Sequence, residues 1–545
     1  MAKARIPGAR FGLPERADGP AWLVSVAGLA LVAGYAFLAW IRAVEPLGLD
    51  QGLFALFGRL VPEGWLPYRD LWDSKPPLVL YTYPLAFALF GERVAALWWF
   101  EGAWLGLTAL GAGVMASRLW GRWAGIAAAF FLVAGMWAPG WGGYWARAQA
   151  ELFLALPLLG AAWFAWLGRE RADAPFWCGV LTGIASLYKV PAAFLLAAWP
   201  GVWVGSPKGG PWWKKLGGML LGAVAPWLVV VLYFKLRGGL SEMIAAVFTY
   251  NTVYADMIAR GTSLPAAALG ALSELVRSIP ALTIAGAIGL VELVVRRRAE
   301  ALWLVPWVVA TLVAIVLQRQ LAGYHFLLAV PGLALAAAYG IVTVGLAIRN
   351  GGGARILGLG ALVVLLGLAL PQVGRWQTAY GPDLELRRGR LSPDAYLARF
   401  DSGGPFSPAA ELAAARLVDG ASASRQRLLV WGLSPGIYFH AERTPATPFA
   451  FHHVLLTDSP LSAHFGDLSA RRARLIEDLR KDPPGVILVG TRDANGFEPE
   501  DSYTQMIRFP ELRQLVERSY AEGPPVGRFR VYTLKPPAGA PWEAR

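Results

Sequence analysis

Long apolar runs constrain this chain more than any other feature of its sequence. A helix that crosses a bilayer needs about 20 mainly apolar residues, and its backbone polar groups must be satisfied within the segment itself. The chain is 56% hydrophobic and only 16% charged, whereas soluble domains carry roughly 25% charged residues. We therefore predict an all-α polytopic membrane protein with about eleven transmembrane helices. The predicted spans lie near residues 21–41, 94–117, 123–139, 150–168, 175–188, 190–205, 216–236, 275–295, 301–317, 324–348 and 355–372.

The positive charge of the chain is concentrated in this apolar part. Residues 1–375 contain 29 Lys/Arg and 17 Asp/Glu, against 21 and 20 in residues 376–545. In a soluble protein a net charge of +13 would suggest nucleic acid. Short basic loops that follow the positive-inside rule explain it better, so we expect no nucleic-acid partner.

The basic loops also predict an orientation. With residues 1–20 as a cytoplasmic tail, six short cytoplasmic segments hold sixteen basic residues, and an odd number of spans leaves the C-terminal part outside. We predict a tail at 1–20, a transmembrane domain at 21–375 and an extracytoplasmic domain at 376–545. The sixteen residues are Lys3, Arg5, Arg10, Arg16, Arg118, Arg122, Arg169, Arg171, Lys208, Lys214, Lys215, Arg296, Arg297, Arg298, Arg349 and Arg355.

The C-terminal domain reads as a small α/β unit. Candidate strands lie at 428–432, 485–490 and 527–535, and residues 469–481 and 510–520 have helical spacing. No glycine-rich phosphate loop and no metal-ligand spacing occurs in it. We expect surface or loop positions for its histidines, which are His440, His452, His453 and His464.

Two outer segments, 42–93 and 237–274, are too long to be plain connectors. Within the first, residues 51–61 and 77–90 are short amphipathic or apolar stretches, which predicts helices lying at the membrane interface. The second stretch could instead span the membrane, but the loop that carries Arg118 would then face outward. Polar residues are thus concentrated on the outer side.

The first of these outer segments carries the most informative residues. Asp50 follows the first span, and Tyr68, Asp73 and Lys75 follow within the stretch PYRDLWDSKPPL, whose double proline fixes the chain. Ionisable groups at a membrane boundary are expensive unless they serve a function. The alternative is a solvated loop whose charges only mark topology.

Further polar residues fall on the same predicted face. Lys189 lies between two apolar runs and is either an outer-loop cation or a buried one. Together these cations and acids could bind a lipid-linked phosphate and still leave one carboxylate free as a base. The residues are Arg147 and Glu151 after the third span, Lys189, and Arg319, Tyr324 and His325 at the tenth span.

These motifs resemble the GT-C superfamily of membrane glycosyltransferases, in particular the bacterial branch of protein O-mannosyltransferases and the lipid A aminoarabinose transferase. The resemblance covers roughly residues 20–345. The first-loop acid of that family matches Asp50, although this chain has Gln51 where the family often has a second carboxylate. The remaining matches are the lysine-proline motif at Lys75-Pro76, the acid Glu151, the lysine Lys189, and the basic-tyrosine motif at Arg319 and Tyr324.

The resemblance implies an inverting transfer of sugar from a polyprenyl-phosphate donor to the hydroxyl of a lipid, glycan or protein, outside a bacterial inner membrane. Asp50 would be the base. The predicted donor-phosphate ligands are Lys75, Arg147, Lys189 and Arg319. A supporting role, in binding a metal or the acceptor, is expected for Asp73, Glu151, Tyr68, Tyr324 and His325. A divalent cation bridging Asp50 or Glu151 to the phosphate is an open alternative.

Two other functions compete with this hypothesis. A transporter or flippase of lipid-linked or anionic substrates would place ionisable groups near the bilayer midplane, often within inverted repeats. No repeat is visible, although Glu101 and Glu292 lie in or near apolar runs. A non-catalytic envelope scaffold would leave Asp50 and Lys75 unexplained.

Overall fold

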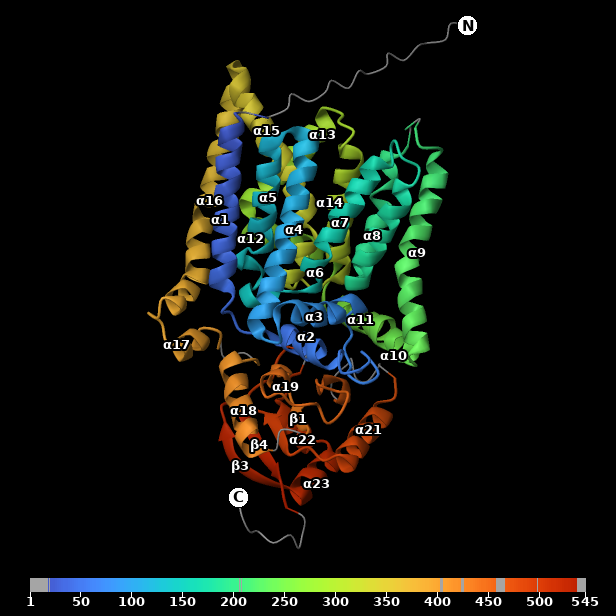
Figure 1. Ribbon diagram of the computed structural model, residues 1–545, viewed down its shortest axis with the longest axis vertical. Helices are drawn as coiled ribbons and strands as arrows, with labels where there is room; N and C mark the ends of the chain where they lie inside the picture. Colours follow the sequence, from blue (N-terminus) through green and yellow to red (C-terminus); the bar gives the residue numbers. More distant parts are fainter. Residues whose placement is uncertain are drawn as a thin grey trace.

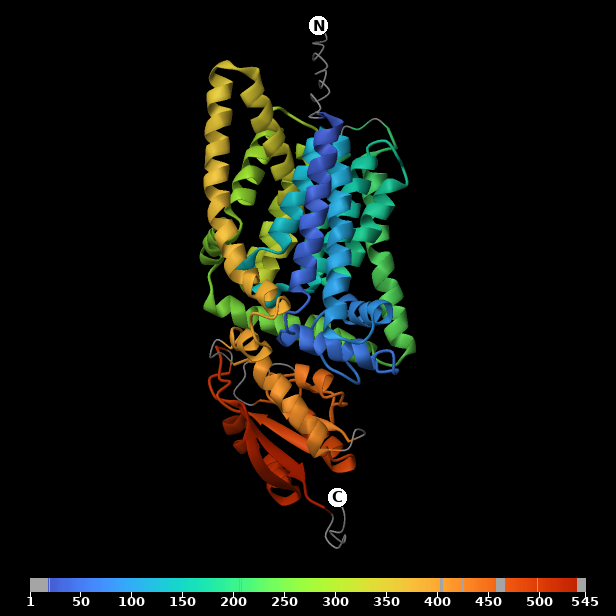
Figure 2. The same ribbon diagram turned by 60° about the vertical axis from the view of Figure 1, so that its left-hand side comes forward.

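The computed structural model describes residues 18, 20–204, 206, 208–401, 405–422, 426–456, 466–496 and 498–536. These residues form a bundle of helices with a smaller domain at one end (Figure 1). A view turned by 60° shows the same arrangement, with short helices lying across the end of the bundle that meets the domain (Figure 2). The predicted fold class, an all-α bundle with a small α/β domain, is confirmed.

Seven helices in the described part of the chain are long and apolar enough to cross a membrane. Helices α12 (Leu264–Ser278) and α13 (Pro280–Val295) meet at a bend of 112° and give an eighth span if they count as one. The predicted number of about eleven is therefore not confirmed. The seven are α1 (Ala21–Arg42), α5 (Arg122–Met136) continued to Trp141, α6 (Ala150–Phe153) with α7 (Ala155–Leu167), α9 (Trp212–Leu236), α14 (Ala301–Gln318), α15 (Val330–Asn350) and α16 (Gly352–Arg387).

The other apolar segments of the bundle include one long helix, one short helix and two 3₁₀ helices. Helix α4 (Val94–Trp120) runs through the bundle beside α1 and α5 (Figure 1). Helix α8 (Ala174–Tyr188) has 15 residues, about 22 Å at 1.5 Å per residue, which is less than the ~30 Å hydrocarbon core. Past Lys189 the chain turns back as two 3₁₀ helices, η3 (Val190–Ala197) and η4 (Pro200–Val202).

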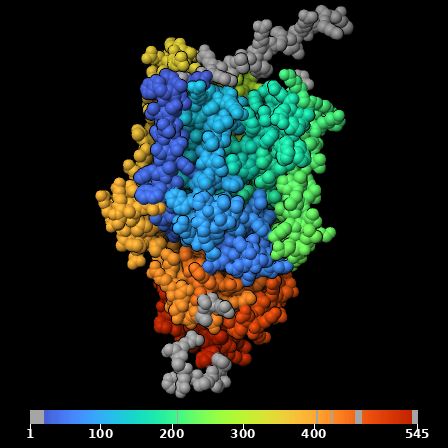
Figure 3. Space-filling model, viewed as in Figure 1, coloured from blue at the N-terminus to red at the C-terminus, as the bar shows by residue number. Residues whose placement is uncertain are grey.

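Short helices form a layer between the bundle and the C-terminal domain. Helices α2 (Leu49–Leu60) and α3 (Pro77–Phe90) correspond to the predicted interfacial stretches and lie across the end of the bundle (Figure 1). The second outer segment supplies α10 (Leu240–Ile244), the π-helix η5 (Ala245–Tyr250) and α11 (Asn251–Gly261). In the space-filling view this layer rests directly on the C-terminal domain (Figure 3).

The C-terminal domain contains four described strands in the order β1-β2-β4-β3. Strand β1 (Leu428–Trp431) is parallel to β2 (Val486–Gly490), whereas β4 (Phe529–Leu534) is antiparallel to β2 and to β3 (Tyr520–Val526). Both parallel strands are fully buried, as expected for strands with covered faces. The helices of the domain include α17 (Pro393–Ala398), α18 (Pro408–Ala421), α19 (Gly436–His440), α21 (Leu468–Lys481), α22 (Ser502–Ile507) and α23 (Pro510–Ser519), and the 3₁₀ helix η7 (His453–Leu455).

Strand β3 was not predicted from the sequence, because its segment YAEGPPV contains two prolines. It lies at the edge of the sheet and is largely exposed, which is where prolines are tolerated in a strand. The predicted boundary between residues 375 and 376 falls within α16, which continues to Arg387 and then leads into the domain.

Candidate functional site

The predicted acid and lysine of the first outer segment meet at the N-terminus of α2. Asp50 lies in the first turn of this helix, and its Oδ1 is 3.6 Å from Nζ of Lys75. The other oxygen, Oδ2, accepts a hydrogen bond of 3.1 Å from the side-chain amide of Gln149. The side chains of Asp50 and Lys75 are 20% and 29% exposed, so the pair is accessible from outside the bundle.

The loop before α3 orients Lys75. Tyr68 has a left-handed backbone, with φ of 73°, and its buried hydroxyl donates to the carbonyl of Lys75 at 2.8 Å. Pro76 and Pro77 then begin α3 directly after the lysine. A proline at the first helical position needs no amide partner and presets φ, so the position of Lys75 is fixed from both sides.

Asp73 is the second carboxylate near Lys75. It is buried, Oδ1 accepts from the backbone amide of Ser74 at 2.6 Å, and Oδ2 has no hydrogen-bond partner among the described residues. Burial raises the pKa of Asp73 to about 6, Lys75 opposes the rise and Asp50 adds to it. Partial burial lowers the pKa of the Lys75 ammonium, but the surrounding acids, Asp50 first, outweigh it and hold this pKa well above its usual value, so Lys75 stays charged at neutral pH.

A second ion pair lies beside the first. Glu151, in α6, pairs with Lys189, which stands between α8 and η3. Nζ of Lys189 lies 5.8 Å from the ring centroid of Tyr324. Because Tyr324 also interacts electrostatically with Asp50 and Lys75, the two ion pairs form one site.

His325 completes this site as a neutral side chain. Its Nδ1 contacts the carbonyl of Gln320 at 2.8 Å, while Nε2 lies 4.0 Å from the Glu151 carboxylate. Burial and the nearby Lys189 keep the pKa of His325 well below its usual value. The helix that carries it, η6 (Gly323–Leu328), precedes α15.

Arg147 does not lie with these residues. Its guanidinium is buried and pairs with Glu101, donating from Nε at 2.7 Å, and with Glu45 at 3.3 Å. It also donates to the carbonyl of Arg42 and covers the ring of Trp98 at 4.2 Å. These partners hold the guanidinium inside the bundle, and neither Asp50 nor Lys75 is among them. Its role as a phosphate ligand stays a prediction. Glu101, which the sequence left in an apolar run, is the partner that balances it.

Arg319 is also engaged elsewhere. It ends α14 in a left-handed conformation, with φ of 53°, and NH1 donates to the carbonyls of Ala259 and Thr262 at 2.6 and 3.0 Å. These carbonyls lie at the C-terminus of α11, where a cation is favoured. These hydrogen bonds of Arg319 hold α11 in place and do not connect it to Asp50 or Lys75.

Similar proteins were found among solved structures but not by sequence comparison. No protein-family model matches the sequence, and no curated protein matches it. The apo structure of ArnT, the lipid A aminoarabinose transferase, from Cupriavidus metallidurans is similar, with a TM-score of 0.53 and 15% identity over 93% of this chain and 98% of that chain. The ArnT structure bound to undecaprenyl phosphate gives 0.52 and 15% over 92% and 97%.

The chain has the GT-C fold. An oligosaccharyltransferase from Archaeoglobus fulgidus aligns at a TM-score of 0.47 and 14% identity, over 95% of this chain and 76% of that chain. Because the fold extends over nearly the whole length of ArnT, the resemblance inferred from the motifs around Asp50 is confirmed at the level of architecture.

Gln51, the residue after Asp50, has a structural role in this fold. Gln51 is fully buried, and Nε2 contacts the carbonyls of Arg147 and Trp145 at 2.6 and 3.0 Å. A glutamate would present only acceptor oxygens to these carbonyls. In this chain the position therefore ties α2 to the loop that carries Gln149.

Several residues of the site were missed or left without a role by the sequence. Gln149 lies between Arg147 and Glu151 in the sequence, but sequence spacing alone does not show that it contacts Asp50. Tyr254, in α11, interacts with Lys75 and Asp50 and with Gln320. No sequence signal distinguishes it, because its approach depends on how α11 folds back over the site.

The C-terminal domain also reaches the site. Nε2 of His453 lies 3.2 Å from the hydroxyl of Tyr250, and the ring of Trp72 lies 5.0 Å from Tyr250 and 5.7 Å from His453. The backbone amide of Trp72 donates to the carbonyl of Pro448. Burial lowers the pKa of His453 to about 3, with help from His452 and Lys75, so this histidine is neutral.

Two of these histidines differ from the expected surface or loop positions. His452 is buried inside the C-terminal domain, with Nε2 close to Ser502 at 3.0 Å and to Gln505 at 2.8 Å. His453 packs against the layer of short helices, as described above, and His440 lies at the end of α19. His464 lies outside the described residues. The core of the domain buries His452, whereas docking of the domain covers His453, and composition signals neither.

The site residues do not fit a metal held by protein ligands. No group of three His, Cys, Asp or Glu side chains in the described ranges is arranged to hold an ion. The oxygens of Asp50 already face Lys75 and Gln149, and Glu151 already pairs with Lys189. We therefore derive no catalytic step through a divalent cation.

Proposed function

We propose that this protein is a membrane glycosyltransferase that moves a sugar from a polyprenyl-phosphate donor to an acceptor hydroxyl, with inversion. One observation carries the proposal. A partly exposed carboxylate, Asp50, stands 3.6 Å from the ammonium of Lys75 at one end of a GT-C bundle. The fold is shared with an ArnT structure that holds undecaprenyl phosphate, which supports a lipid phosphate as the ligand of such a site.

In the proposed reaction one residue acts as the base and two lysines bind the phosphate of the donor. Asp50 accepts the proton of the acceptor hydroxyl as its oxygen attacks the anomeric carbon. The bond between that carbon and the phosphate oxygen breaks, and the polyprenyl phosphate leaves with its electron pair. Lys75 and Lys189 stabilise the charge on this phosphate, as fixed cations do for a leaving group.

The remaining polar groups of the site hold these residues in position. Gln149 orients Asp50 through its amide, and Tyr68 holds the backbone of Lys75. Glu151 pairs with Lys189, while Tyr254 and Tyr324 line the space between the two ion pairs. Below its pKa of about 6 Asp73 is largely protonated, which removes one negative charge that would repel the donor phosphate. His325 is uncharged and adds neither attraction nor repulsion.

The orientation in the membrane follows from the basic loops. The loops that join α4 to α5, α7 to α8, and α15 to α16 lie at the end of the bundle away from the C-terminal domain (Figure 1), and they are basic. By the positive-inside rule that end is cytoplasmic. We therefore assign the site and residues 376–545 to the extracytoplasmic side of a bacterial inner membrane, with 1–20 inside and 21–375 as the transmembrane catalytic domain.

The test is reconstitution of the full chain in vesicles. A panel of polyprenyl-phosphate-linked sugars is supplied together with lipid, glycan and protein acceptors from the cell envelope. Mass spectrometry then measures free polyprenyl phosphate and the sugar mass added to each acceptor. We expect both products in equal amounts from at least one donor. Passage of intact donor across the bilayer with no transfer would instead identify a flippase.

A further inference from the structure

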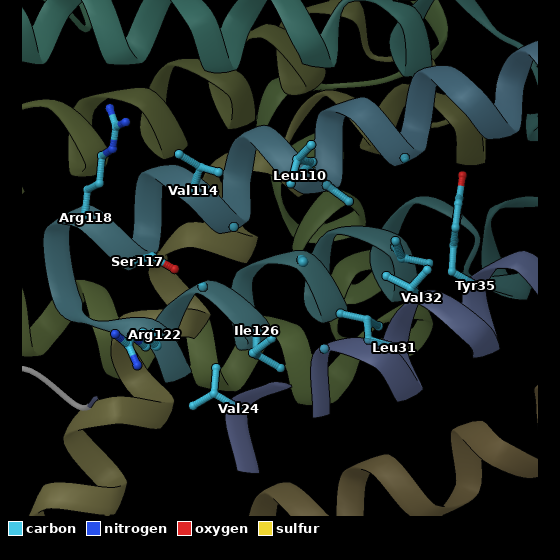
Figure 4. A pocket seen from close by; sticks show the side chains of 17 residues that line it. Val24, Leu31, Val32, Tyr35, Leu110, Val114, Ser117, Arg118, Arg122 and Ile126 are labelled. Atoms are coloured by element: carbon cyan, nitrogen blue, oxygen red, sulfur yellow. The ribbon is translucent and has the colours of Figure 1, made fainter. Parts of the chain in front are cut away.

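A deep apolar groove lies between α1, α4 and α5, away from the candidate site. Its volume is about 500 Å³, and its walls come from these three helices. They are apolar apart from a tyrosine, a serine and two arginines. Figure 4 shows Arg118 and Arg122 at one end of the groove and Tyr35 at the other. The hydroxyl of Tyr35 donates to the carbonyl of Gly102 and so closes that end.

Small residues on all three helices give the groove its depth. Gly113 and Gly125 bring α4 and α5 into close contact, because a Cβ at Gly125 would meet the backbone carbonyl of Gly113 at 2.7 Å. On the α1 side a Cβ at Gly28 would meet only Ile126, at 3.5 Å. Helix α1 is largely exposed, with 11% of its spanning window buried inside the protein. The groove is therefore open to the bilayer, where a chain of lipid can enter from the side.

The length of the groove matches one leaflet. Twelve residues separate Gly106 from Arg118 along α4, which corresponds to about 18 Å at 1.5 Å per residue. Half of the ~30 Å hydrocarbon core is about 15 Å. A single acyl chain of one leaflet can thus lie along the groove with its glycerol and headgroup at the arginine end.

The charges at that end favour an anion. Arg118 and Arg122 are exposed and form no ion pair with any residue that the structure describes. The guanidinium of Arg118 lies 5.5 Å from the ring centroid of Trp163 in α7, and its side chain points away from the other labelled groove residues, so Arg122 is the arginine on the side of α1 (Figure 4). Basic pockets between transmembrane helices at the cytoplasmic face typically bind the headgroups of anionic lipids.

We propose that this groove binds a diacyl phospholipid with an anionic headgroup, one acyl chain against α1, α4 and α5 and its phosphate at Arg122. Helix α5 begins with Arg122 at the end of the bundle opposite to α3, and Lys75 directly precedes α3 (Figure 1). A donor whose phosphate is held by Lys75 cannot also place that phosphate here, so the lipid is a separate ligand. The site is independent of the proposed transfer reaction.

The experiment compares two lipids with the same acyl chains, phosphatidylglycerol and phosphatidylcholine. The full chain is purified in mild detergent, each lipid is added in turn, and native mass spectrometry measures the bound fraction while a thermal scan measures Tm. We expect phosphatidylglycerol to bind about tenfold more tightly, the scale of one charge-assisted hydrogen bond, and to raise Tm. Equal binding of both lipids would overturn the proposal.

Two matched pairs of variants locate the site. Arg122→Gln should lose the preference for phosphatidylglycerol, whereas Arg349→Gln, at the end of α15 on the same side of the bundle, should keep it. Gly28→Phe fills the groove and should reduce the bound fraction. Gly34→Phe, on the same helix but with open space around it, should not. Equal lipid binding by the two members of either pair would contradict the proposal. So would a competition experiment in which polyprenyl phosphate displaces phosphatidylglycerol from the wild-type protein but not from Arg122→Gln.

Discussion

The side-chain amide of Gln149 donates a hydrogen bond of 3.1 Å to Oδ2 of Asp50. This bond joins the start of α2 to the start of α6, almost a hundred residues apart in sequence. It leaves Oδ1 to face Lys75, so one oxygen of the carboxylate is oriented by an amide and the other by a cation. Together the two contacts hold the carboxylate in one orientation at the N-terminus of α2.

Replacing Asp50 tests the assignment of the base. Asp50→Asn keeps the shape of the side chain and can still meet Gln149, but it cannot accept a proton. We expect polyprenyl phosphate binding to persist and turnover to fall about 10²–10⁴-fold, the scale of general base catalysis. Release of polyprenyl phosphate from the donor is the measurement.

Glu151→Gln serves as the control for that experiment. Its partner Lys189 would lose a counter-charge, so donor binding should change more than the chemical step. An active Asp50→Asn together with an inactive Glu151→Gln would reverse the assignment, and full activity in both would falsify the mechanism.

Substitutions at Lys75 and Arg147 should have different effects, although both residues were predicted from the sequence to bind the donor phosphate. Lys75→Ala removes a cation of the site and should weaken polyprenyl phosphate binding about tenfold or more, since charge-assisted hydrogen bonds contribute about 1.5–3 kcal/mol. Arg69→Ala, in the same loop but paired with Asp70, should bind normally. Equilibrium binding of radiolabelled polyprenyl phosphate separates these outcomes.

Arg147→Ala should lower the stability of the folded protein. It would leave Glu101, which is fully buried, without its guanidinium, and breaking a buried ion pair costs about 3–5 kcal/mol. We expect a large drop in Tm or loss of monodisperse protein, with Arg147→Lys partly restoring it. A stable Arg147→Ala protein that fails only in donor binding would return Arg147 to the site.

Gln51→Glu tests whether this position can carry the second carboxylate of the family pattern. The change removes the amide that holds the carbonyls of Arg147 and Trp145 and places acceptor oxygens against them. An unsatisfied buried group costs about 1–3 kcal/mol, so Tm should fall and more so at pH 8 than at pH 5, where the new carboxyl can protonate. Increased activity at unchanged Tm would contradict this account.

The raised pKa of Asp73 predicts that the stability of the folded protein depends on pH. Its pKa is about 6 in the folded protein against an ordinary value of 3.8, so the folded state binds the proton more tightly than the unfolded state. Stability should therefore fall as pH rises from about 4 to about 6, and change little from this group above that. The difference corresponds to about 3 kcal/mol. In thermal scans Asp73→Asn should flatten this slope, whereas an unchanged slope would exclude Asp73 as its source.

The amino-acid sequence by itself determined the helical, apolar character of the bundle, the two short helices of the first outer segment and the α/β character of the C-terminal domain, and it singled out Asp50 and Lys75, which the structure brings together. These features depend on local composition and on charges placed next to apolar runs, which are visible along the chain. The strand at Tyr520–Val526 was missed because its prolines are tolerated only at a sheet edge, and edges exist only in the assembled sheet.

Only the tertiary structure decided which charges face each other. Arg147, Lys189 and Arg319 look alike in sequence, each a cation near the end of an apolar run. Their partners are carboxylates and carbonyls that lie between 38 and 105 residues away, and ion pairing depends on distance in space. Because a buried cation requires a counter-charge, Glu101 fixed the position of Arg147 inside the bundle, and Lys189 alone of the three stayed beside Lys75.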